Sequence, residues 1–212
     1  MKIAIIGAGN SGCALAADYS KKGHTVTLIK TSRGLHEDNF TYLSSNGGVI
    51  TTDEFGTESI CTVSRLSRDL EDVSGCDIII VCLQTIYHKE LLTKLVPLLK
   101  KGQILLINPG YLSTAYVLGI CPNPEFIVAE SESNFIDGRI SAPGMFRVGF
   151  RNVRNPVGIY PKSKKTFAES KLNQLGTPFV YLNSVVEAAL HNPNMIVHTV
   201  GAVMSIPRIE AT

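Results

Sequence analysis

Short apolar runs alternate with amphipathic stretches through the first half of this chain. Apolar runs of strand length lie at residues 2–6, 25–29, 77–83 and 103–107. Helical apolar spacing occurs between them, at 11–22 and 85–99. Strands that are apolar on both sides are typical of parallel sheets covered by helices on both faces. The pattern therefore predicts an α/β fold of Rossmann type, with a doubly wound and mostly parallel sheet.

Two further β-like runs, 48–52 and 57–63, interrupt this alternation and are separated by Asp53–Gly56. Their spacing predicts a β-hairpin inserted into the parallel scheme. Short helices are predicted near 37–43, 67–72 and 113–118, and a longer one over 164–175. The remaining β-like runs lie at 126–129, 145–150, 156–160 and 179–182.

After Asn183 the pattern becomes helical, over 185–191 and then from Pro193 to Ser205. Asn192 is a good N-cap, and proline suits the first helical position. The second of these helices is apolar on nearly all sides, which predicts that it is buried. We expect this helix to be covered either by a partner subunit in a homo-oligomer or by further residues of a longer chain, and we favour the second. The predicted domains are an α/β domain, 1–183, and the start of a truncated helical substrate or dimerisation domain, 184–212.

A glycine-rich turn joins the first strand to the first helix. It contains Gly7, Gly9 and Gly12, with Asn10 and Ser11 between them. In a dinucleotide-binding βαβ unit, the first glycine permits the tight turn, the second lets the backbone approach the pyrophosphate, and the third lets helix and strand pack closely. The helix N-terminus then presents free N–H groups to the phosphates. Because a second strand follows at the expected distance, the turn predicts a dinucleotide site, and residues 1–183 are the predicted dinucleotide-binding domain.

The residues after the second strand are basic or hydroxylated: Lys30, Thr31, Ser32 and Arg33. An NAD site normally has Asp or Glu here, to accept hydrogen bonds from the ribose 2′-hydroxyl. Lys30 and Arg33 would instead attract a 2′-phosphate, to which Ser32 could donate. This favours NADP. NAD remains the alternative, because these charges could be solvated and Glu37 or Asp38 could reach the ribose.

Other cofactor contacts are expected where later strands end. Ligands of open α/β sheets bind outside the carboxyl ends of the strands. The residues at those ends are Cys82, Leu83, Gln84, Asn108 and Pro109. We expect them to flank the ribose and nicotinamide, the alternative being that Asn108-Pro109-Gly110 is simply a turn.

Composition excludes several other classes. Of 212 residues, 44% are hydrophobic and the net charge is +2, so neither a nucleic-acid nor a membrane surface is indicated. No apolar run is long enough to span a bilayer. The five cysteines are scattered and odd in number: Cys13, Cys61, Cys76, Cys82 and Cys121. They predict buried thiols in a reducing compartment, without a metal site, and hence a cytoplasmic protein.

His198 and Asn194 are four residues apart and therefore share one face of the last helix. A histidine on an apolar helix is more often structural than catalytic. Reduction of a carbonyl or imine, however, requires a proton donor beside the hydride donor, and histidine titrates near neutral pH. His198 is therefore the candidate catalytic residue.

The chain resembles the octopine/nopaline (opine) dehydrogenase family. The resemblance rests on the glycine-rich start, on G-G-V-I-T-T with G-T-E-S-I, on A-E-S-E-S at 129–133, and above all on V-E-A-A-L-H-N-P-N-M-I-V-H at 186–198. It implies a Rossmann cofactor domain and a helical domain that receives an amino acid and a 2-oxo acid. These condense to an imine, which NAD(P)H reduces. By similarity, His198 would be the proton donor and acceptor, and Asn194 would bind substrate.

Two alternatives remain. One is a 2-oxo acid reductase similar to ketopantoate reductase. Those enzymes use a catalytic lysine, and no lysine follows Lys171 in this chain. The other is a nucleotide-binding module without catalysis.

Overall fold

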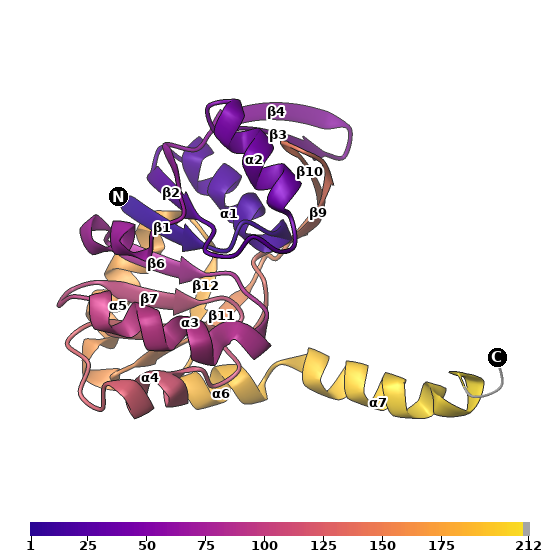
Figure 1. Cartoon of the computed structure of the whole chain (residues 1–212). Coiled ribbons are helices and arrows are strands. Elements are labelled where there is room, and N and C mark those ends of the chain that lie inside the picture. The colour runs from indigo at the N-terminus through magenta and orange to yellow at the C-terminus, as the bar shows by residue number, and fades with distance from the viewer. Residues whose placement is uncertain (210–212) are drawn as a thin grey trace.

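The main sheet has eight strands in the order β12-β11-β8-β7-β6-β1-β2-β5 (Figure 1). The computed structural model describes residues 1–209, except for the side chains of 193–195 and 207–209. The strands of this sheet are β1 Lys2–Ile6, β2 Thr25–Ile29, β5 Arg65–Ser67, β6 Ile78–Val81, β7 Ile104–Ile107, β8 Ile127–Ser131, β11 Asn155–Tyr160 and β12 Phe179–Tyr181. All neighbours pair in parallel except β8 and β11. The doubly wound, mostly parallel sheet that the sequence predicts is thus confirmed.

Helices cover both faces of this sheet. The α-helices of the domain are α1 Asn10–Lys21, α2 Glu37–Ser45, α3 His88–Leu95, α4 Thr114–Ile120, α5 Lys165–Leu172 and α6 Val185–Leu190. Short 3₁₀ turns span Leu70–Gly75, Thr85–Tyr87, Val96–Leu98, Lys162–Lys164 and Asn173–Leu175. Alternate residues of β6 enter two cores: Ile80 packs in the core that includes α1 and α5, and Ile79 in the core that includes α3 and α4. Burial on both faces explains why β6 is apolar throughout.

A second, four-stranded sheet has the order β4-β3-β10-β9 and lies beside α1 (Figure 1). Its strands are β3 Val49–Glu54, β4 Thr57–Thr62, β9 Ile136–Ala142 and β10 Met145–Arg151. The predicted hairpin is confirmed as β3 and β4, which pair antiparallel. The prediction from the sequence did not include β9, or the parallel pairing of β10 with β3. Ile50, Phe146 and Val148 of this sheet share a core with α1.

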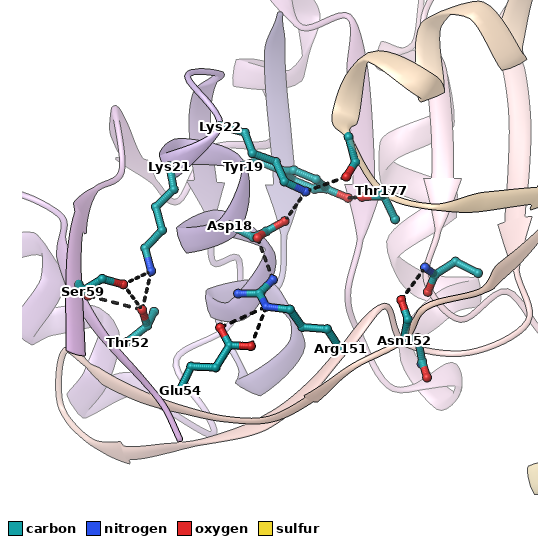
Figure 2. Close-up of polar contacts among 12 residues, drawn as sticks. Asp18, Tyr19, Lys21, Lys22, Thr52, Glu54, Ser59, Arg151, Asn152 and Thr177 are labelled. Atoms are coloured by element: carbon teal, nitrogen blue, oxygen red, sulfur yellow. Dashed lines mark hydrogen bonds and ion pairs between the residues drawn. The ribbon is translucent and has the colours of Figure 1, made fainter. Parts of the chain in front are cut away.

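A buried carboxylate ties α1 to the second sheet (Figure 2). Asp18 on α1 has a side chain only 10% exposed, and it pairs with Arg151 of β10 at 2.7 Å. Arg151 also donates to both carboxylate oxygens of Glu54 on β3, at 2.9 and 3.1 Å. Nearby, Lys21 donates to Thr52 on β3. These contacts hold the C-terminal half of α1 against the second sheet.

Arg151→Ala is expected to lower the free energy of unfolding by about 1–2 kcal/mol, because it leaves two carboxylates without their shared cation. Arg147 is a matched control, since it also lies on β10 and pairs with a hairpin carboxylate, Asp53, but is 70% exposed. Arg147→Ala should cost less than about 0.5 kcal/mol, as exposed ion pairs do. Urea unfolding of both variants is the measurement. Equal losses would contradict a special role for the Asp18 contact.

Two short elements differ from the prediction near residue 67. The expected helix over 67–72 is instead the edge strand β5 followed by a 3₁₀ turn. β5 forms because Arg65–Ser67 pairs with β2, a contact that local sequence does not encode. Gly23 ends α1 with a φ of +82°, as predicted for a helix C-terminus.

The last helix, α7, spans Pro193–Ile209 and begins where the proline predicts. The prediction that it is buried is wrong for this chain. Ile196 is 65% exposed, Val200 55% and Met204 73%, because α7 projects away from the α/β body (Figure 1). Over the residues that the structure describes, neither α7 nor any other helix is long and apolar enough to cross a membrane. In contrast, α6 packs on β8 and β11, and the domain division at residue 184 stays a prediction.

Candidate dinucleotide-binding site

The glycine-rich turn has no room for side chains at two of its glycines. Gly7 has a φ of +112°, and a Cβ there would lie 2.4 Å from the carbonyl oxygen of Cys82. A Cβ on Gly12 would lie 1.6 Å from the carbonyl oxygen of Gly7. The Gly7 N–H donates to the carbonyl of Ile29 at 2.8 Å. These contacts pack the turn between β1, β2, β6 and α1, which is the geometry that the motif predicts.

The N-terminus of α1 suits an anion. The helix begins at Asn10, immediately after Gly9, and neither a capping side chain nor an acidic first-turn residue neutralises it. Its first N–H groups and the positive end of the helix dipole therefore face the turn. The diphosphate of a dinucleotide fits such a site.

A cluster of polar side chains adjoins this N-terminus: Ser11, Asn108, Ser131 and Asn134. The Ser11 hydroxyl donates to Asn134 Oδ1 at 3.1 Å. Asn108 Nδ2 lies 3.3 Å from Ser11 Oγ, and Asn108 Oδ1 accepts from the Ser131 hydroxyl at 2.8 Å. Asn108 is 1% exposed, and its side chain packs against the start of α1 through Ser11. A direct contact with the cofactor stays a prediction for it.

Asn10 also has a structural partner. Its side-chain oxygen accepts a hydrogen bond from the N–H of Ile140 at 2.9 Å. Because Ile140 belongs to β9, the second sheet reaches the first turn of α1 directly. The second sheet thus positions the phosphate-facing end of the helix.

The segment after β6 is held by a buried histidine. His88 Nε2 lies 3.0 Å from the carbonyl oxygen of Leu83, and His88 Nδ1 lies 2.7 Å from Ser113 Oγ. Burial lowers the pKa of His88, although the hydrogen bond with Leu83 opposes this, and the ring bridges the loops after β6 and β7. Gln84 is exposed and Pro109 half-buried.

Cys82 is buried, and that burial raises the pKa of its thiol to about 12, although hydrogen bonds with Ser11 and Asn108 oppose the rise. A neutral thiol is not a nucleophile at physiological pH. Cys82 therefore contributes its backbone to the site. All five cysteines are free, and four of them are buried as predicted, whereas Cys121 is half-buried.

Glu130 is a fully buried carboxylate at the end of β8. It accepts hydrogen bonds from the N–H of Leu112, at 2.8 Å, and from the N–H and hydroxyl of Thr114. It thereby caps the N-terminus of α4. Burial raises the pKa of Glu130, and these hydrogen bonds oppose the rise. A side chain at Gly110 would collide with this carboxylate.

Charged groups meet beyond the end of β2. Lys30 is buried, and its ammonium donates to the carbonyl of Leu35 at 2.9 Å and lies 3.8 Å from the Glu37 carboxylate. Arg68 pairs with the same carboxylate and lies over the ring of Phe40. The residues Thr31, Ser32 and Arg33 are exposed. Lys30 is thus already engaged by protein groups, whereas Arg33 is accessible.

The structure brings together the predicted residues of the first turn and of the ends of β2, β6 and β7. It does not bring His198 to them: His198 is exposed on the projecting helix α7. The side chain of Asn194 lies outside the described residues. Sequence reasoning missed several residues of the site: Arg68, His88, Glu130, Ser131 and Asn134. The polar run from 130 to 134, directly after an apolar strand, was a usable signal for the last three.

Within the described part of the chain, no group of three or more His, Cys, Asp or Glu side chains could hold a metal ion. A surface hollow of about 570 Å³ lies between Val96 and Phe126. It adjoins the starts of β7 and β8, at the edge of the sheet opposite the glycine-rich turn. The hollow is therefore separate from the dinucleotide site.

Solved structures of oxidoreductases share this fold. Octopine dehydrogenase with NADH and L-arginine matches with a TM-score of 0.73 at 15% identity, covering 92% of this chain and 52% of that one. Apo yersinopine dehydrogenase matches with a TM-score of 0.71 at 15% identity, covering 92% and 50%. The PanE/ApbA family ketopantoate reductase from Ralstonia eutropha JMP134 matches with a TM-score of 0.64 at 19% identity, covering 86% and 57%. This chain thus spans about half the length of these proteins.

Comparison with curated protein sequences finds no significant match. The family model for ketopantoate reductase PanE/ApbA matches residues 3–136. That region contains the glycine-rich turn, the end of β2 and the polar run after β8. The chain therefore belongs to the ketopantoate reductase PanE/ApbA family, and it shares its fold with the opine dehydrogenases.

Proposed function

We propose that this chain is the cofactor-binding part of an NAD(P)H-dependent oxidoreductase. The observation that carries the proposal is the uncapped N-terminus of α1, placed behind a turn where Gly7 and Gly12 admit no side chain. The family membership and the NADH-bound octopine dehydrogenase of the same fold support it. When bound, the cofactor supplies hydride, and the residues of this chain hold and orient its ADP half.

Of the two cofactors, we propose NADPH. Arg33 is accessible, and Arg68 and Lys30 bring further positive charge to the end of β2. Glu37 pairs with both Lys30 and Arg68. A 2′-phosphate could therefore replace the Glu37 carboxylate as the anion that binds Arg68. A 2′-hydroxyl would gain only the Glu37 oxygens as acceptors.

Fluorescence titration of the chain with NADPH and NADH tests both statements. We expect saturable binding of each, with the tighter dissociation constant for NADPH. Tighter binding of NADH would contradict the assignment of the 2′-phosphate site. Absence of saturable binding by either would contradict cofactor binding itself.

For the reaction, we propose reduction of the imine formed from an amino acid and a 2-oxo acid. The Asn-Pro-Asn-x-x-x-His segment ending at His198 supports it, with His198 as proton donor and Asn194 as a substrate contact. So does the fold shared with octopine dehydrogenases that were crystallised with L-arginine, agmatine and pyruvate.

A second candidate is reduction of a 2-oxo acid alone, which the family match over 3–136 favours. The two reactions differ in their need for an amine. Oxidation of NADPH should be measured for the protein at its native length, with a panel of 2-oxo acids, each with and without amino acids. Turnover that requires the amino acid supports imine reduction, whereas turnover without it supports the second candidate. A protein that binds cofactor and turns over neither would be a binding module.

A further inference from the structure

The imidazole of His36 lies against the second glycine of the turn. A Cβ built on Gly9 would be 3.4 Å from ring carbon Cδ2 and 3.8 Å from Nε2 of His36. His36 belongs to the loop between β2 and α2, so two segments separated by 27 positions meet here. Gly9 is the position where the backbone of such a turn approaches the diphosphate. The ring therefore borders the path that the diphosphate would follow.

The backbone holds this ring in place. His36 has a φ of +61°, in the left-handed region, and is the N-cap of α2. Its carbonyl accepts a hydrogen bond from the Phe40 N–H at 3.1 Å. The next residue, Glu37, is held by Arg68 and Lys30. The first turn of α2 is thus anchored, and with it the histidine.

The ring itself has no hydrogen-bond partner among the residues that the structure describes, and its side chain is half-buried. An imidazole carries at least one N–H donor in either protonation state. The donor thus lies beside Gly9, the N-cap of α1, without a protein acceptor among the described residues.

We propose that His36 is a binding residue for the ADP half of the cofactor, donating a ring N–H to a diphosphate oxygen. This inference rests on the proposed cofactor function. The imidazole would then add one donor to the N–H groups at the start of α1 that face the diphosphate. The alternative is that the ring only packs on Gly9 and must move aside, in which case its removal would leave binding unchanged or tighten it.

The test is isothermal titration of the whole chain with NADPH and with ADP-ribose, in the wild type and in His36→Asn. Asparagine tolerates the left-handed backbone, so the substitution removes the ring without adding strain. We expect both ligands to bind about 10- to 100-fold more weakly, as for loss of one hydrogen bond to a charged group. The unfolding midpoint in urea should be unchanged. His24→Asn is the control, because His24 precedes β2 at the opposite edge of the sheet, and it should bind as the wild type does.

Unchanged or tighter binding of ADP-ribose by His36→Asn would overturn the proposed role of His36 but not the proposed cofactor function. A loss of affinity accompanied by a lower unfolding midpoint would also overturn it, since the histidine would then act through folding of the loop. A wild type that binds none of NADPH, NADH and ADP-ribose would overturn the proposed function, and this inference with it.

Discussion

Gly12→Ala is expected to weaken NADPH binding by about 100-fold or more, through loss of charge-assisted hydrogen bonds worth about 1.5–3 kcal/mol each. The added Cβ would lie 1.6 Å from the Gly7 carbonyl oxygen and 2.8 Å from its carbonyl carbon. Both are backbone atoms, so no side-chain rotation relieves the overlap. The turn and the start of α1 must separate, which moves the N–H groups away from the diphosphate. Overpacking of this kind also costs about 1–3 kcal/mol of stability.

Gly119→Ala is the matched control. Gly119 lies in α4, where an added Cβ would meet no atom within 4 Å. Since alanine is favoured over glycine inside helices, this variant should bind NADPH normally and be as stable as the wild type or slightly more so. Fluorescence titration and urea unfolding measure both effects. Wild-type affinity in Gly12→Ala would refute the assignment of this turn to the diphosphate.

The parallel sheet could be predicted because its strands carry local signals. β6 is apolar on both faces, and α1 begins at a glycine-rich turn and is followed, after its C-cap, by Gly23. The second sheet could not, because its pairing of β3 with β10 joins residues more than 90 positions apart. β9 is different, because its residues do alternate: Asp137, Arg139 and Ser141 lie between Ile136, Gly138, Ile140 and Ala142, so this strand carried a local signal that the prediction missed.

The residues of the candidate site also divide into those that local sequence predicts and those that only the fold brings together. The glycines could be predicted because their spacing follows from the geometry of one βα unit. His36 could not, because only the fold shows that its ring reaches Gly9. Lys30 shows that a charged residue in the sequence need not be a free cation in the fold. The sequence predicts that Lys30 is available to a 2′-phosphate, whereas in the structure it is buried and bound to Leu35 and Glu37.

α7 shows a third kind of difference. Its apolar sequence predicts burial, but within this chain its side chains are exposed. The proposed role of His198 requires this helix to lie near the nicotinamide, and therefore in surroundings that exclude water from its apolar faces. The proposed catalytic role of His198 would therefore require other groups to cover α7, and such groups would complete the substrate site.

His198→Ala is accordingly expected to lower turnover by about 10²- to 10⁴-fold, the usual contribution of one general acid. The protein should be tested at its native length, with NADPH and whichever substrates the activity panel identifies. The dissociation constant of NADPH should be unchanged, because none of the described contacts of the glycine-rich turn comes from α7. A lower turnover with unchanged cofactor affinity would separate proton delivery from cofactor binding.

The control for this experiment is His191→Ala. His191 is also exposed and lies only seven positions earlier, at the end of α6. It precedes the Asn-Pro-Asn segment and does not share the helix face of Asn194 and His198, so its loss should leave turnover within about twofold of wild type. If His198→Ala turned over like His191→Ala, the proton would have to come from another group, and His198 would be a structural residue of α7.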